Sequence, residues 1–75
     1  MSNHLQNTTA HFEHNDPLLN DVEGCAILGI AKPTWHKWVK RGLIPKPVKL
    51  GHLSRWPRSE ILAVIENAKA ARNAA

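Results

Sequence analysis

A stretch from Lys32 to Lys40, KPTWHKWVK, restricts the possible fold more than any other part of the sequence. On an α-helix, Trp35, Trp38 and Val39 form one narrow apolar stripe, and lysines occupy the opposite side. A helix this short is marginal in isolation, so the two indole rings indicate that it is held against a core. The sequence therefore predicts a helix over about 32–41 with a packed aromatic side and an exposed cationic side.

The positive charge is concentrated around this same stretch. The formal net charge is +4, and no Asp or Glu occurs between Glu23 and Glu60. Eight of the ten Lys and Arg residues fall in that acid-free segment: Lys32, Lys37, Lys40, Arg41, Lys46, Lys49, Arg55 and Arg58. Unmixed positive charge interleaved with tryptophan indicates a polyanionic partner rather than a merely solvated surface.

Several classes of protein are disfavoured by what the sequence lacks. Cys25 is the single cysteine, so neither an internal disulfide nor a paired-thiolate zinc site is available, and a reducing compartment is expected. No signal peptide is recognisable, and no stretch reaches the ~20 apolar residues that cross a bilayer. Paired carboxylates, a nucleophile with a base and a phosphate-binding glycine loop are also missing. We therefore expect a soluble cytoplasmic protein with no enzymatic activity and no cofactor.

The first residues of the chain differ from the rest. Residues 1–16 are polar and have no hydrophobic period, which predicts a disordered arm. His4, His11 and His14 lie in this arm without the spacing of a helical ligand pair, so we expect no metal site there. The ordered domain is predicted over 17–72, followed by a frayed tail at 73–75.

A first helix is predicted immediately after the arm. Asn20 and Glu23 have the spacing of a capping box, in which each side chain accepts a hydrogen bond from the other residue's backbone N–H. Leu19 stands in the position of a hydrophobic staple. The helix should therefore begin at Asp21, and Gly29 is suited to end it in a left-handed conformation.

Gly24 lies inside this first helix, where it costs ~1 kcal/mol relative to alanine and indicates close approach of another element. Cys25 beside it is expected to be a small core residue rather than a nucleophile. The segment 29–31 is then a three-residue turn that joins two short helices, a connection typical of a helix-turn-helix.

The second half of the chain predicts a hairpin and a last helix. Gly42 ends the helix over 32–41, since the prolines at 45 and 47 prevent its continuation. Residues 48–50 and 53–56 read as two strands joined by a tight turn at 51–52. Pro57 is suited to the first position of a helix over about 58–72. The predicted core comprises Trp35, Trp38, Val39, Trp56, Ile61 and Ile65, with Val64 flanking it.

This order of helix, turn, helix, hairpin and helix predicts a mainly α fold with a small β-hairpin wing, a winged helix-turn-helix. The residues also match a family. From Leu18 to about Ala71 the chain resembles the AlpA-like and excisionase-like proteins, a branch of the MerR-type DNA-binding fold. The resemblance is carried by LLNDVE, LGIAKPTWHKWVKRG, IPKPVKLG and RWPRSEI.

The resemblance implies a sequence-specific DNA-binding protein of a bacterial mobile element or prophage. Members act as recombination directionality factors, which bind and bend attachment-site DNA so that an integrase excises, or as transcription regulators, for example of integrase genes. Both functions remain open, as does a protein-interaction adaptor with a basic face. The implied partners are double-stranded DNA, an integrase and further copies side by side on DNA, with the protein at the nucleoid when bound.

The resemblance also assigns residues. It places four side chains of the second helix at the major groove: Lys32, Thr34, His36 and Lys37. It places the wing residues His52, Ser54 and Arg55 over a neighbouring minor groove or phosphates. Lys37 can reach guanine and Thr34 can meet thymine or a purine, although phosphate contacts remain an alternative for both. His36 is either packed in its neutral form or donates to a phosphate when protonated.

The remaining cations are expected on phosphates, where they position the protein without reading sequence. They are Lys40, Arg41, Lys46, Lys49 and Arg58. Three residues depart from the family pattern: Ala31 replaces a usual capping serine, Gly24 a usual aliphatic residue, and His52 a frequent arginine at the wing tip. We therefore expect a weaker start of the second helix and altered packing of the first.

Overall fold

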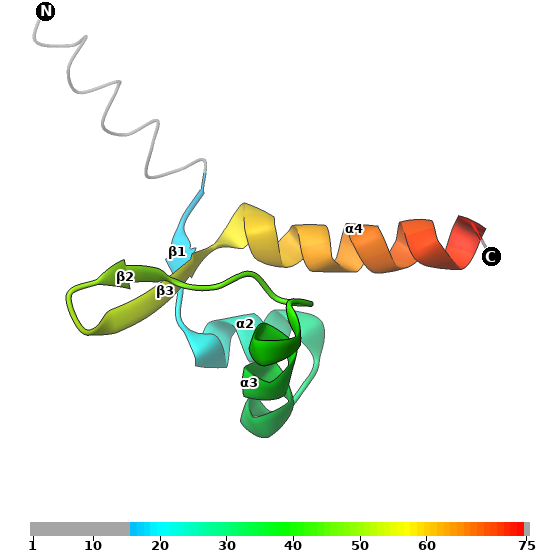
Figure 1. The fold of residues 1–75 in the computed structure, drawn as a ribbon. Helices are drawn as coiled ribbons and strands as arrows, with labels where there is room; N and C mark the ends of the chain where they lie inside the picture. Colours follow the sequence, from blue (N-terminus) through cyan, green and yellow to red (C-terminus); the bar gives the residue numbers. More distant parts are fainter. Residues whose placement is uncertain (1–15, 75) are drawn as a thin grey trace, which may run out of the picture.

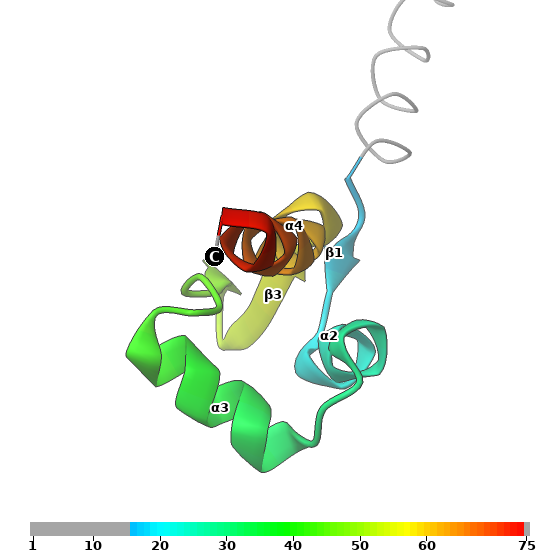
Figure 2. The ribbon, with the colours of Figure 1, turned by 90° about the vertical axis from the view of Figure 1, so that its right-hand side faces the viewer.

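The computed structural model describes residues 16–74. This part of the chain contains, in order, β1 (Leu18–Leu19), α2 (Asp21–Leu28), α3 (Lys32–Arg41), β2 (Val48–Leu50), β3 (Leu53–Pro57) and α4 (Arg58–Ala74). Figure 1 shows the hairpin of β2 and β3 at one end of the domain and α4 extending towards the other. Figure 2 looks along α4 and shows the three helices arranged around β3. The predicted fold, mainly α with a β-hairpin wing, is confirmed.

Both ends of α2 follow from local signals in the sequence. The Asn20 side chain accepts a hydrogen bond from the Glu23 N–H at 2.8 Å, and the Glu23 carboxylate accepts one from the Asn20 N–H at 2.8 Å. Gly29 ends the helix with a left-handed φ of 68°. The predicted capping box and the predicted helix end are therefore confirmed.

Local signals also set the two ends of α3, although no side chain caps its start. Ala31 occupies the N-cap position and makes no side-chain hydrogen bond, while Pro33 lies in the first turn, where a missing N–H costs nothing. Gly42 ends the helix with φ of 83° and donates its N–H to the carbonyls of Trp38 and Val39. The predicted range of 32–41 is confirmed.

The sheet contains one strand more than the sequence predicts. β3 lies between β1 and β2 and pairs antiparallel with each of them. The hairpin is confirmed, but Leu18–Leu19 also forms a strand, with Leu19 opposite Trp56. The staple predicted for Leu19 is wrong: the staple partner position in α2 is Gly24, which has no side chain. Leu19 instead packs into the core.

The boundaries of the last helix also differ from expectation. Pro57 is the last residue of β3 rather than the first of the helix, and α4 continues to Ala74, through residues expected to fray. The Asp16 carboxylate accepts hydrogen bonds from the N–H and hydroxyl of Ser59 at 2.9 and 2.8 Å. Asp16, which was assigned to the arm, therefore caps α4 across 43 residues. The rest of the predicted arm, with His4, His11 and His14, lies outside the described residues.

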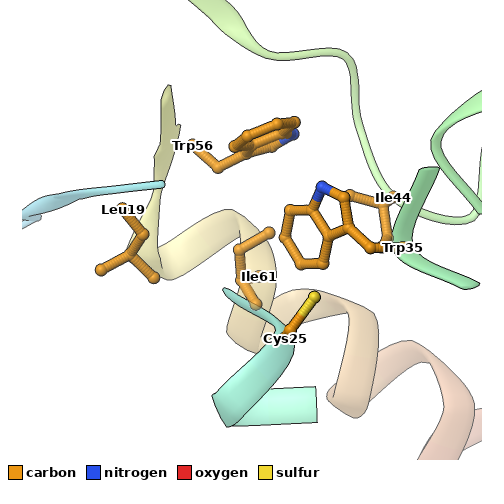
Figure 3. Packing of buried hydrophobic residues seen from close by; sticks show 6 residues of the cluster. All are labelled: Leu19, Cys25, Trp35, Ile44, Trp56 and Ile61. Carbon is orange, nitrogen blue, oxygen red and sulfur yellow. The ribbon is translucent and has the colours of Figure 1, made fainter. Parts of the chain in front are cut away.

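The core is a small cluster in which aromatic rings dominate. Figure 3 shows its six buried residues: Leu19, Cys25, Trp35, Ile44, Trp56 and Ile61. Ile44 is fully buried and was not predicted. Trp38 and Val39 are half-buried at the edge of the cluster, where Val64 also packs. Ile65, which was predicted in the core, lies outside the cluster and lines an open groove with Leu28 and Ala68.

Gly24 is required because the Trp35 ring lies directly against it. A Cβ atom at Gly24 would stand 2.2 Å from Cη2 and 2.4 Å from Cζ3 of Trp35. Trp35 is completely buried and meets Trp56 edge to face, with ring centroids 4.9 Å apart and planes at 86°. The predicted close approach of another element to Gly24 is confirmed, and that element is α3.

The two indole N–H groups have different partners. Trp56 donates to the Pro45 carbonyl at 2.7 Å, which fixes the loop between α3 and the hairpin. Trp35 Nε1 is buried, and no nitrogen or oxygen of residues 16–74 accepts from it. Figure 3 shows this nitrogen on the side of the ring that faces Trp56.

We predict that Gly24→Ala destabilises the domain. Helix propensity alone favours alanine by about 1 kcal/mol, but overpacking against a buried ring costs about 1–3 kcal/mol. The free energy of unfolding, measured by urea denaturation, should fall in Gly24→Ala and fall less when Trp35→Leu is already present. A more stable Gly24→Ala protein would show that the Trp35 ring is not held against α2.

Candidate nucleic-acid interface

The two sides of α3 meet different surroundings. Trp35 is fully buried, and Trp38 and Val39 are half-buried against the core. Lys37, Lys40 and the adjoining Arg41 are exposed on the opposite side. A helix anchored by aromatic rings on one side thus presents its cations outward.

Most of these cations have no acidic partner. Among residues 16–74, the ion pairs are Lys32 with Asp21 at 3.7 Å, His36 with Asp21 at 3.6 Å, and Lys69 with Glu66 at 3.3 Å. The cations at 37, 40, 41 and 46 form no ion pair within the described residues. Their charge is therefore available to an external anion.

The four predicted base-contact residues do not form one uniform group. Lys37 is exposed in the middle of the cationic side, whereas Thr34 is half-buried at its edge. Lys32 and His36 lie on the flank near Asp21, with side chains 57% and 60% exposed. His36 is thus not packed in the core, and it contacts the Asp21 carboxylate, a neighbour that its position in the sequence does not reveal.

The wing holds its own cations in place. Lys49 Nζ donates to the Ser54 hydroxyl at 2.9 Å, and Arg55 Nη1 donates to the Ser54 carbonyl at 2.8 Å. Gly51 turns the hairpin with φ of 65°, and His52 is exposed beside it. Ser54, which was assigned to the DNA-facing loop, organises both cationic side chains of the wing.

One face of the wing carries three exposed apolar side chains beside Arg55. The strand register places Leu50 opposite Leu53 and Val48 opposite Arg55, so these four side chains share a face. Leu50 and Leu53 are 47% and 43% exposed, and Val48 is 42% exposed. The alternation of Val48, Lys49 and Leu50 was the signal from which this face could have been inferred.

A groove lies between the helices and the wing. Asp21 of α2 and His36 of α3 line it on one side, and His52, Ser54 and Arg55 line it from the wing. Of the predicted site residues, the groove therefore brings together His36 of α3 and the wing residues His52, Ser54 and Arg55.

Other kinds of site find little support in residues 16–74. No group of three His, Cys, Asp or Glu side chains in this region could hold a metal ion. Burial, with a smaller contribution from the Asp21 carboxylate, raises the pKa of the Cys25 thiol, which disfavours the reactive thiolate. No helix in the same region is long and apolar enough to cross a bilayer.

Comparison with protein families agrees with this geometry. The model of a helix-turn-helix domain matches residues 18–69, from β1 into α4. Comparisons with curated proteins and with solved structures gave no match. The matched segment contains both helices, the turn between them, the wing and most of α4. Because this match spans more than half of the chain, the protein belongs to the helix-turn-helix domain family of DNA-binding proteins.

Proposed function

We propose that this protein is a recombination directionality factor of a mobile element, which binds and bends attachment-site DNA and directs an integrase towards excision. The observation that carries the binding step is the cationic side of α3, exposed beside a wing and fixed to the same aromatic core. The protein acts by binding rather than by catalysis, with several copies side by side on the duplex.

The geometry suggests a division of roles along this surface. α3 enters the major groove, where the exposed ammonium group of Lys37 can reach guanine O6 and N7. Lys40 and Arg41, in the last turn, contact phosphates and fix the register. The wing, with Lys49 and Arg55 held by Ser54, meets the neighbouring backbone.

The wing also supplies a means of bending DNA. Leu50 and Leu53 flank the turn of the hairpin and face solvent together. Proteins that bend DNA often place apolar side chains between base steps of the minor groove, which unstacks the bases and kinks the duplex. A pair of exposed leucines at the wing tip fits this role better than the polar side chain of His52.

The phosphate contacts predict a strong dependence on salt. With about five contacts, log K against log salt should have a slope of about −4 to −5, because each contact releases condensed counterions. Replacing Lys40 and Arg41 together by alanine should make this slope shallower by about 2. The fluorescence anisotropy of a labelled duplex, recorded over a salt series, measures this slope. Lys69→Ala on α4 is the matched control, and its slope should equal that of the wild type. Equal slopes for all three proteins would rule out phosphate binding by α3.

The leucine pair predicts a separation of bending from binding. In Leu50→Ala/Leu53→Ala, the end-to-end distance of a doubly labelled duplex, measured by energy transfer, should return towards that of free DNA. Binding should persist because the cations remain. Leu18→Ala, at a side chain 46% exposed on β1, is the control and should leave the bend unchanged. An unaltered bend in the double variant would exclude the wing leucines as its cause.

The excision role is tested with an integrase from the mobile element that carries the gene for this protein. On a plasmid carrying both attachment sites, excised product should require the protein and should be lost in Lys37→Ala/Lys40→Ala. A gel-shift titration on the same DNA should give more than one bound band if copies line up. Excision that proceeds equally without the protein would leave transcription regulation as the function, and the absence of any DNA binding would favour a protein adaptor.

A further inference from the structure

Asp21, at the start of α2, is the acidic residue that contacts α3 within residues 16–74. One carboxylate oxygen, Oδ2, lies 3.7 Å from Lys32 Nζ and 3.6 Å from His36 Nε2. The Asp21 side chain is 27% exposed, about half the value of either partner. One carboxylate thus contacts two side chains that the family resemblance places at the major groove.

This carboxylate also faces the DNA-binding surface. Asp21 and His36 line the same groove as Arg55 of the wing. A negative charge in this position repels a phosphate, whereas it attracts the ammonium group of Lys32. A phosphate that approaches this flank must therefore compete with Asp21 for Lys32.

We propose that Asp21 is a specificity-determining residue of the DNA interface. It holds Lys32 and His36 in one orientation and disfavours their use as general phosphate contacts. The proposal rests on the DNA binding proposed above. In the complex with a preferred sequence, both side chains keep the orientation that Asp21 gives them and are directed at base edges.

The contact of Asp21 with Lys32 and His36 can be selective only if it affects the affinities for two DNA sequences differently. Specificity is a difference between two affinities, so a residue contributes only if it changes one affinity more than the other. Binding to unrelated sequences relies on phosphate contacts and counterion release. Asp21 keeps Lys32 away from phosphates and therefore weakens non-specific binding. A contact of Lys32 with base edges is unaffected as long as Lys32 stays paired with Asp21.

Asp21 also has a local role in α2, and the test must separate the two roles. Its Oδ1 accepts a hydrogen bond from the Val22 N–H at 2.8 Å, and its charge lies in the first turn, where helix dipoles favour acids. Loss of these effects changes the stability of the domain. It does not change the number of counterions that DNA binding releases.

The decisive variant is Asp21→Asn, which removes the charge and keeps an oxygen for the Val22 N–H. Two duplexes are compared by anisotropy across a salt series: one recovered by selection from a random-sequence library, and a shuffled version of it. For the shuffled duplex, affinity should rise about two- to five-fold, the range expected for an exposed ion pair. Its salt slope should steepen by about 0.9, because one more cation reaches a phosphate. The preference for the selected duplex should fall accordingly.

Two controls attribute this change to the proposed contact. Glu66→Gln makes the same change in net charge on α4, where Glu66 pairs with Lys69 at 3.3 Å, and should leave the preference unchanged. In a chain carrying Lys32→Gln and His36→Gln, adding Asp21→Asn should leave the preference for the selected duplex unchanged, because the side chains through which it selects are absent.

The possible failures are distinguishable. If the wild-type protein binds neither duplex, the proposed DNA-binding function itself is wrong. If the wild type prefers the selected duplex and Asp21→Asn raises both affinities equally, or changes neither, Asp21 does not determine specificity. An effect of full size in the chain without Lys32 and His36 would equally overturn the assignment.

Discussion

The contact between the Trp35 ring and Gly24 determines how the two helices of this domain lie against each other. The ring is completely buried, and a single added carbon at Gly24 would overlap it. Trp35 also meets Trp56 edge to face, and Trp56 donates to the Pro45 carbonyl in the loop before the hairpin. One aromatic pair thus orients α3 and positions the wing. In a chain of this length, where the buried fraction of the surface is small, such a shared anchor is an efficient solution.

The same arrangement explains how a small domain tolerates a concentrated positive charge. Eight cations between Lys32 and Arg58 repel one another and lower the stability of the free protein. The core under α3 offsets this cost, because the cations project into solvent while the tryptophans remain packed. Within the described residues, Asp21 is the acid that contacts the cationic helix, and it does so at one flank only. The remaining charge is therefore directed outward, where a polyanion can neutralise it.

How much of this could be read from the sequence depended on the range of each interaction. The limits of α2 and α3 were predicted correctly because their signals are local: a capping box at Asn20 and left-handed glycines at the ends. β1 was missed because two residues have no period, and the cap that Asp16 supplies to α4 spans 43 residues. Neighbouring side chains of α4 could not be ranked, since which of them faces the core depends on where α2 and β3 lie. The site shows the same dependence on range. The cationic side of α3 could be predicted from its own sequence, but the contact of Asp21 with Lys32 and His36 could not, because it depends on how α2 packs against α3.

The central claim is that α3 binds DNA with its cationic side while its tryptophan side stays anchored in the core. Titration of the isotope-labelled protein with a duplex, followed by two-dimensional NMR, tests this directly. The account predicts large shifts for the amides of Lys37, Lys40 and the wing tip, with the indole N–H signals of Trp35 and Trp56 unchanged. Shifts centred on the distal half of α4, or movement of the buried indole signals, would contradict it.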